Sequence, residues 1–169
     1  MTQLPEPGLS LAGLALAHAA WSLSDSQDEE LLCPLAVMES REGERRFMRF
    51  EADSQEEAIV AGKAAVREAT ADVAAWAFAR EAAGRRMDSE DRSHVLAIDF
   101  WAMGMPSAAT IMQHFNRATN GGRFRIGGVP ALVVNGNQLS ASVAAPSIAA
   151  IMAGVKSHAA VAELWPKWR

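Results

Sequence analysis

An Asn-Gly pair between two strand-like segments is the feature that most constrains how this chain can fold. Asn135-Gly136 follows an apolar run at residues 131–134 and precedes a segment, residues 137–144, in which apolar and polar side chains alternate. Both central residues of a two-residue hairpin turn need a positive φ, which asparagine and glycine tolerate well. The sequence therefore predicts a β-hairpin here. Proline is confined to a strand's first residue or to a sheet edge, so we expect Pro130 to open the first strand.

The segment from Phe124 to Ala145, with the helix expected after it, resembles the closing third of a thioredoxin-like domain. In that family, which includes the DsbA-like oxidases, a Val-Pro or Thr-Pro pair at this place has a cis peptide bond and faces the active site. The resemblance implies the same for Val129 and Pro130. We therefore name these two residues as candidate binding residues.

The redox chemistry of that family needs a nucleophilic thiolate and usually a resolving thiol at the start of a helix. This chain has one cysteine, Cys33, which precedes the strand and helix that would carry such a pair. Residues 98–102 are similar to the strand before a thioredoxin Cys-x-x-Cys, but residues 103–106 contain no thiol. Dithiol exchange within one chain is therefore excluded.

Hydrophobic periodicity predicts a single α+β domain, with a mixed β-sheet and helices packed on it. From about residue 45 the expected order is strand, helix, strand, helix, strand, strand, helix, the thioredoxin-like βαβαββα order. The alternative is a plainer α+β domain, an antiparallel sheet with helices on one face. The expected strands are residues 34–40, 45–52, 94–102, 131–134 and 137–144, and the expected helices begin near Leu9, Ser54, Pro106 and Pro146.

The helix at Ser54 begins with the sequence Ser-Gln-Glu-Glu, a capping box in which Ser54 accepts from the amide of Glu57. Beyond Asp72 two structures remain open for residues 73–79. Alanine favours an extended helix to Ala83, whereas a strand would place Trp76 and Phe78 on one face. Residues 84–93 are expected to form a charged loop, and residues 120–122 to end the helix from Pro106.

The apolar residues 9–23 raise the question of a signal peptide or a membrane span. The run is shorter than the roughly 20 residues that cross a bilayer, and no lysine or arginine precedes Arg41. We expect an amphipathic helix instead, so that residues 1–30 form an N-terminal helix and acidic loop and residues 31–169 form the core. A single cysteine is typical of a reducing compartment and suggests a cytoplasmic protein. A secreted protein with an atypical signal is the alternative.

Length and charge limit the classes of partner. A chain of 169 residues, half of it hydrophobic, is large enough to bury a core without disulfides or metals. The net charge of −4 and the mixing of acids among the basic clusters argue against nucleic acid. We expect neither a nucleic acid nor a membrane partner.

Asp99 is the one carboxylate within an apolar strand. It could act as a general acid or base if buried, but we favour a structural ion pair with an arginine such as Arg123 or Arg125. Those two arginines alternate with Phe124 and Ile126, so they share a face and could clamp an anion. Asp99, Arg123 and Arg125 join Val129 and Pro130 as candidate binding residues.

The four histidines have no metal-ligand spacing, so no metal and no cofactor are expected. Cys33 is the redox candidate, and a buried structural thiol is the favoured interpretation. No complete catalytic constellation is found. The sequence therefore suggests a non-catalytic binding or interaction protein that binds a protein partner or its own copy, and the alternative is a single-cysteine thioredoxin-like protein acting on peroxide or glutathione.

Self-association is expected through the last helix. Residues 146–165 are rich in small and apolar side chains around the whole circumference, and their charge is limited to Lys156 and Glu163. Such a helix needs cover on more than one side. A symmetry-related copy could supply the second cover, and packing under the N-terminal helix of the same chain is the alternative.

Overall fold

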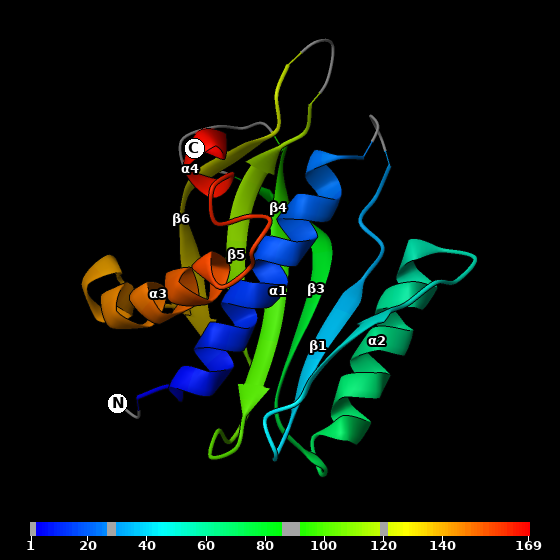
Figure 1. Cartoon of the computed structure of the whole chain (residues 1–169), viewed down its shortest axis with the longest axis vertical. Helices are drawn as coiled ribbons and strands as arrows, with labels where there is room; N and C mark the ends of the chain where they lie inside the picture. Colours follow the sequence, from blue (N-terminus) through cyan, green and yellow to red (C-terminus); the bar gives the residue numbers. More distant parts are fainter. Residues whose placement is uncertain (1–2, 27–29, 86–91, 119–121) are drawn as a thin grey trace.

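The computed structural model describes residues 3–26, 30–85, 92–118 and 122–169 (Figure 1). It confirms an α+β architecture with one large sheet. The expected loop at residues 84–93 and the helix end at 120–122 fall largely outside the described residues. The elements in chain order are α1 (Glu6–Ser24), β1 (Leu35–Ser40), β2 (Arg45–Arg49), α2 (Gln55–Ala69), β3 (Val73–Arg85), β4 (Arg92–Ala102), β5 (Ala109–Asn116), β6 (Arg125–Val134), β7 (Asn137–Gln138), α3 (Ala141–Lys156) and α4 (Trp165–Trp168).

The seven strands form one sheet in the order β2-β1-β3-β4-β5-β6-β7. Each neighbouring pair runs antiparallel. The thioredoxin-like βαβαββα order is therefore not observed, because a strand-helix-strand unit of that order would pair parallel strands. The plainer antiparallel alternative describes the sheet, although helices cover parts of both faces rather than one.

Two hairpins and one helix cap agree with the sequence patterns. β1 and β2 pair across a tight turn, and β6 and β7 pair across Asn135-Gly136, whose φ values of 51° and 78° are both positive. Ser54 caps α2 by accepting from the amide of Glu57 at 3.1 Å. Residues 73–79 belong to β3, so the helical extension was wrong and the strand alternative was right.

The predicted helix from Pro106 is wrong, because residues 109–116 form β5. Its residues Ala109, Ile111, Gln113 and Phe115 are buried in strict alternation. Ile111 and Phe115 stand four residues apart, a spacing that suits a helix as well as a strand, and this coincidence explains the error.

The segment around Pro130 also differs from expectation. The described residues contain no cis peptide bond, so the cis bond implied for Pro130 is wrong. Pro130 lies within β6, beside a break in register against β5 between Met112 and His114. A proline is tolerated at such a bulge because no ladder amide is needed there.

The second strand of the last hairpin is only two residues long, and α3 begins at Ala141 rather than at Pro146. Pro146 is therefore inside the helix. Its missing amide leaves the Ser142 carbonyl without a helical donor, and Ser142 is exposed, so water can take that place.

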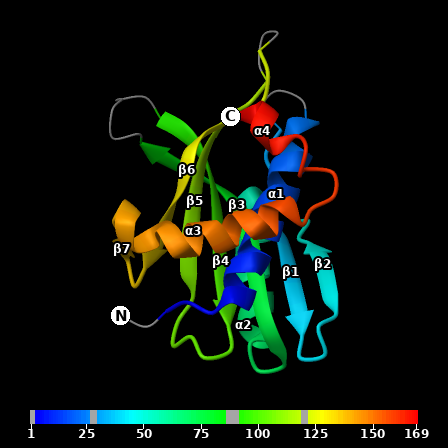
Figure 2. The same ribbon diagram turned by 60° about the vertical axis from the view of Figure 1, so that its left-hand side comes forward.

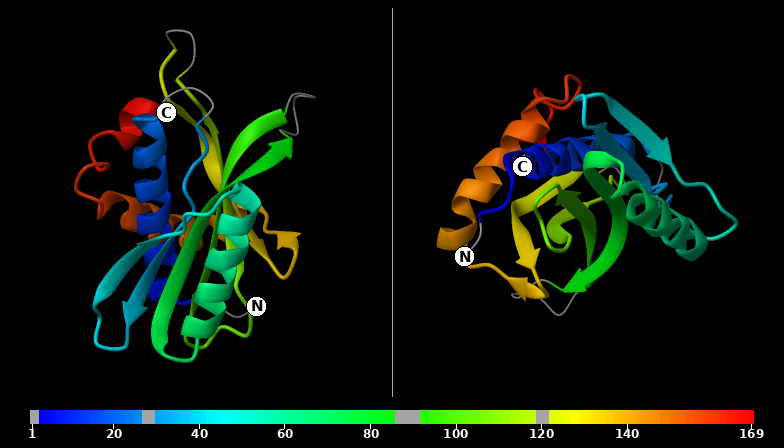
Figure 3. Two further views of the ribbon diagram at one scale, coloured as in Figure 1. Left: turned by 90° about the vertical axis from the view of Figure 1, so that its right-hand side faces the viewer. Right: turned by 90° about the horizontal axis from the view of Figure 1, so that it is seen from below.

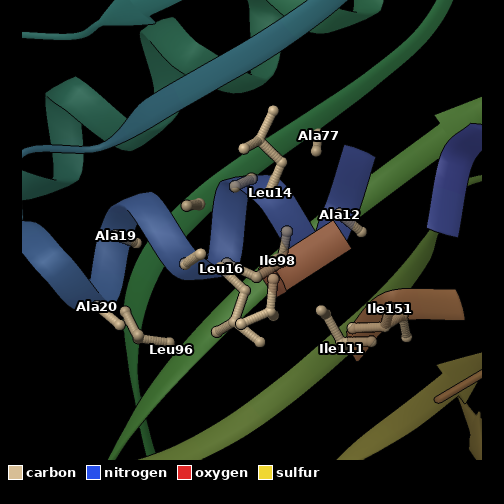
Figure 4. Close-up of a cluster of buried hydrophobic side chains, with 14 of the residues drawn as sticks. Ala12, Leu14, Leu16, Ala19, Ala20, Ala77, Leu96, Ile98, Ile111 and Ile151 are labelled. Carbon is tan, nitrogen blue, oxygen red and sulfur yellow. The ribbon is translucent and has the colours of Figure 1, made fainter. Parts of the chain in front are cut away.

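The two sheet faces carry different helices. α1 and α3 lie against one face, and α2 lies against the other, over β1 and β3 (Figures 2 and 3). Between α1 and the sheet lies the main hydrophobic core, which includes Leu16, Leu96, Ile98 and Ile111, all fully buried (Figure 4). Within the described residues, no helix is both long and apolar enough to cross a membrane.

α1 and α3 cross at two glycines. A Cβ atom added to Gly13 would overlap the backbone of Ile151, and one added to Gly154 would overlap the backbone of Ser10. The two helix backbones therefore touch where these glycines meet. α1 thus covers one side of α3, in agreement with the alternative in which the N-terminal helix of the same chain packs on this helix.

Candidate functional site

Strand register places an unusual set of side chains on the sheet face beside α2. Phe78 of β3 stands opposite Asp99 of β4, which stands opposite Thr110 of β5. One step along, Trp76 stands opposite Trp101. Side chains directly opposite in an antiparallel pair share a face. The alternation that buries Leu96, Ile98 and Phe100 under α1 thus sends Asp99 and Trp101 to the α2 side.

α2 covers only part of this face. Gly62 lets the helix lie directly on the ring of Phe78, because a Cβ at this position would overlap that ring. Phe50 packs edge-on against the same ring, with centroids 5.9 Å apart. The helix is thereby held over β3 and leaves the neighbouring part of β4 uncovered.

A groove of about 350 Å³ follows the boundary between α2 and β4. The indoles of Trp76 and Trp101 and the carboxylate of Asp99 line it from the sheet. Lys63 and Arg67 line it from α2. Its remaining lining residues come from α2, its C-cap and the β4–β5 turn, namely Val66, Thr70, Pro106, Ser107 and Ala108.

Both indole N–H groups of the groove are already bonded within the protein. Trp76 Nε1 donates to Thr70 Oγ1 at 2.8 Å, and Trp101 Nε1 donates to the Met105 carbonyl at 2.9 Å. These bonds fix the orientation of each ring. A ligand in the groove would therefore meet the exposed ring carbons, mainly those of Trp101, rather than the N–H groups, because Trp76 is only 7% exposed.

Asp99 is held by two donors. Arg80 Nη1 donates to Oδ2 at 2.9 Å, and Thr110 Oγ1 donates to Oδ1 at 2.7 Å. The expected structural ion pair is present, but its arginine is Arg80 and not Arg123 or Arg125. Arg80 lies on the adjacent strand, one diagonal step from Asp99, whereas Arg125 pairs with Asn116 at the far end of β5.

The helix side of the groove is cationic. Lys63 and Arg67 are exposed and stand one turn apart on α2. Neither forms an ion pair with any residue that the structure describes. Like charges at this spacing repel one another by a few tenths of a kcal/mol, and an anion between them would relieve that repulsion.

The other candidate binding residues are not gathered at this groove. Val129 is 64% exposed, and Pro130 is buried. Arg123 and Arg125 are exposed, while Phe124 and Ile126 between and after them are buried, so the predicted alternation is present. The structure therefore brings neither arginine to Asp99.

Cys33 lies outside the groove, in the segment that leads from α1 into β1. It is half-buried, and its Sγ approaches the carbonyl oxygens of Phe50 and Pro34 at 3.5 and 3.8 Å. It lines a pocket of about 270 Å³ that also includes Asp25, Glu30 and Arg49. Carbonyl acceptors suit a protonated thiol, which can donate, rather than a thiolate.

Sequence reasoning found Asp99 but missed the rest of the groove. Trp76 and Phe78 share a face only if residues 73–79 form a strand. The helical interpretation of these residues therefore gave no indication that Trp76 lines the groove. Lys63 and Arg67 gave no signal, because charges on a helix usually face solvent. Among the described residues, no group of three or more histidine, cysteine or acidic side chains is placed to hold a metal ion.

Neither the models of protein families, nor the curated proteins, nor the solved structures contain a match to this chain. The residues of the groove are therefore the basis on which its function can be inferred.

Proposed function

We propose that this chain is a non-catalytic binding protein whose groove takes a small ligand with a planar apolar body and an anionic group. The observation that carries the proposal is the pairing of two fixed indoles with two cations. Trp101, which is partly exposed, and the small exposed part of Trp76 offer aromatic surface, and Lys63 and Arg67 stand beside them without an acidic partner in the described chain.

Charge and size both suit such a ligand. The charge of Asp99 is offset by Arg80, so Lys63 and Arg67 give the groove a net positive charge. Arginine can bind a carboxylate or phosphate through two parallel hydrogen bonds. A volume of about 350 Å³ lies at the small end of the range for ligand sites.

The lining favours binding over chemistry. Asp99 accepts from Arg80 and from Thr110, so its carboxylate is held in a structural ion pair. The hydroxyl of Ser107 donates to Asn135 rather than to a base. The described lining therefore offers no nucleophile beside a free general base.

Calorimetric titration with naphthoate and with its neutral analogue naphthamide tests the ligand class. The two probes share the planar body and differ in charge. We expect naphthoate to bind roughly tenfold more tightly than naphthamide, because charge-assisted bonds are stronger than neutral ones. Equal affinities, or no heat from either probe at millimolar concentration, would contradict the proposal.

Charge-removing variants locate the site. Lys63→Gln with Arg67→Gln should lower naphthoate affinity to that of naphthamide. The matched control is Lys156→Gln with Arg125→Gln, which removes the same charge from exposed positions on α3 and β6. A loss of affinity in the control equal to that in the groove variant would show nonspecific attraction and refute the assignment.

The redox alternative depends on Cys33. Its thiol lies beside the carbonyl oxygens of Phe50 and Pro34 and lines a separate pocket. A peroxide or glutathione assay with a Cys33→Ser control tests this alternative. If the protein is active and the activity is lost in the Cys33→Ser variant, the redox alternative replaces the binding-only proposal.

Self-association through α3 remains a prediction. α1 covers one side of α3, while Val143 near its start is 45% exposed. Sedimentation equilibrium at micromolar concentration measures the state directly. The mass of a monomer would exclude the homodimer, and the remaining hypotheses would be another protein or a small ligand as the partner.

A further inference from the structure

β2 is an outer edge strand of the sheet (Figure 2). The Ser40 amide bonds to the Glu44 carbonyl at 2.8 Å, and the Phe50 amide bonds to the Pro34 carbonyl at 2.9 Å. Hydrogen-bonded pairs recur at every second residue of an antiparallel ladder. Arg46 and Met48 therefore bond to β1, and the N–H and C=O groups of residues 45, 47 and 49 face outward.

The side chains of these outward residues lie on the α1 side of the sheet. Met48 packs with Ala36 and Trp76 under α2, so its neighbours along the strand point the other way. This is confirmed at Phe47, whose ring centroid is 4.8 Å from that of His18 on α1. Arg45, Phe47 and Arg49 thus form a row of cation, aromatic ring and cation.

An exposed aromatic cluster adjoins this row. Phe47 is 46% exposed and Trp21 is 36% exposed. His18 and His158 lie between them, with His18 Nδ1 3.1 Å from His158 Nε2. The ring centroids of Trp21 and His158 are 5.6 Å apart. Apolar surface is therefore available beside the outward-facing backbone of β2.

We propose that β2 binds an acidic, extended segment of a partner protein, which adds to the sheet as a further strand. The segment would pair its backbone with residues 45, 47 and 49. Its side chains facing α1 would be acidic, apolar and acidic, opposite Arg45, Phe47 and Arg49. Addition of a strand to an exposed edge is a common mode of peptide recognition, in which the backbone gives affinity and the side chains give specificity.

A second copy of this chain does not fit the same edge. Two β2 strands paired about Phe47 would place Arg45 of one copy opposite Arg49 of the other, twice. Like charges directly opposite one another in a sheet are destabilising. Arg45 is partly offset by Glu39, but Arg46 and Arg49 form no ion pair within the described residues.

The probe is a blocked peptide of sequence Thr-Glu-Thr-Val-Thr-Glu-Thr, added to the full-length, isotopically labelled protein. We expect the amide resonances of residues 45, 47 and 49 to shift and their hydrogen exchange to slow, because these amides gain acceptors. The amides of Arg46 and Met48, already bonded to β1, should change less. Absence of these shifts at millimolar peptide would refute the proposal and indicate an edge protected by its charges.

A second peptide isolates the backbone contribution. Methylation of the valine nitrogen removes the peptide donor opposite Phe47 and leaves every side chain in place. We expect affinity to fall at least roughly tenfold, the loss that follows when a buried hydrogen bond is removed. Equal binding of the methylated peptide would show attraction by charge without strand addition, and would refute the mode proposed here.

Charge reversal in the protein tests the side-chain pattern. Arg45→Glu with Arg49→Glu should lose the glutamate peptide and bind an analogue in which lysines replace the glutamates. Arg46→Glu is the control, since Arg46 lies on the other face and the preference for the glutamate peptide should persist. The proposal is overturned if Arg46→Glu reverses the preference equally. The Lys63 and Arg67 variants should leave peptide binding unchanged, so this inference and the proposed function fail independently.

Discussion

The two faces of the sheet are covered in opposite ways. On the face under α1, two helices pack together, and small residues let their backbones touch, as at Gly13 and Gly154. On the face under α2, large rings separate a single helix from the sheet, and a groove follows its boundary. Small side chains allow a second helix to approach closely, whereas large ones limit how much of a face one helix can cover.

Polarity follows the same division. The α1 face of β4 contributes Leu96, Ile98 and Phe100, all fully buried. The α2 face of the same strand contributes Asp99 and Trp101, both only partly buried. One strand thus supplies the core on one side and a polar, aromatic surface on the other, and ligand binding is expected on the second side.

The largest effect is expected from Gly13→Ala. The added Cβ would overlap the carbonyl of Ile151, a backbone group that cannot rotate away. We expect the free energy of unfolding to fall by about 3 kcal/mol, the upper part of the range for overpacked cores. Chemical denaturation measures it.

The matched control is Gly8→Ala on the same helix. There the nearest atom to an added Cβ is the Ala102 side chain, at 3.0 Å, so a small shift suffices. We expect a near-neutral result, because the gain in helix propensity offsets the contact. If both variants cost the same, the backbone contact between α1 and α3 is not what closes this face.

Gly62→Ala makes the corresponding change on the open face. The added Cβ would meet the ring of Phe78, which can turn, rather than a backbone group. We expect a loss of about 1.5 kcal/mol, smaller than at Gly13 because the ring and helix can adjust. A loss greater than that of Gly13→Ala, measured by the same denaturation, would reverse the comparison between the faces.

Ser54→Ala removes the side-chain cap of α2. Ser54 Oγ accepts from the Glu57 amide, and alanine leaves that amide without a protein acceptor. We expect a cost of about 1 kcal/mol, and Ser54→Asn, which retains an acceptor, should recover most of it. An unchanged midpoint for the alanine variant would mean that this cap contributes nothing to the stability of the α2 side.

The smallest effect is a pH dependence at the α1 side. Burial lowers the pKa of His18, and the nearby charges of His158 and Arg49 lower it further. Burial also lowers the pKa of His158. Each histidine therefore binds a proton more tightly in the unfolded chain, and its contribution to stability is complete above the ordinary pKa near 6.5 and falls as the pH drops below it.

Denaturation at pH 8 and pH 5 compares the native chain with His18→Gln/His158→Gln. The variant should lose less stability on acidification, since two groups that favour the unfolded state in acid are gone. Carboxylates contribute equally to both proteins and cancel in the difference. An equal acid-induced loss would show that these two histidines do not contribute.

Local signals in the sequence predicted several elements correctly. The capping box at Ser54, the Asn135-Gly136 turn and the apolar strand ending at Ala102 each depend on a few adjacent residues, and each is present. Such elements are specified by backbone preferences that act within one turn or one strand. Tertiary context changed where these elements end, and most at the hairpin, where residues 141–144 belong to α3 instead of the predicted strand.

The errors arose where the apolar residues fitted both the helical period and the alternating period of a strand. β5 could satisfy a helical or an alternating pattern, and only its pairing with β4 and β6 decides between them. The groove was missed for a related reason. Trp76 and Trp101 become neighbours through register between strands, and Lys63 and Arg67 reach them through the placement of α2, so neither contact is local in the sequence.

The crossing of α1 and α3 has a consequence for how the chain reaches its structure. α1 is almost entirely apolar, and it packs on β3 and β4 in the middle of the sequence and on α3 near its end. Contacts between segments so far apart form slowly, because a long loop must close first. During synthesis α1 would remain partly uncovered until α3 leaves the ribosome. We therefore expect chains interrupted before α3 to aggregate, since they expose the apolar surface that Ile151 and Val155 cover in the finished fold.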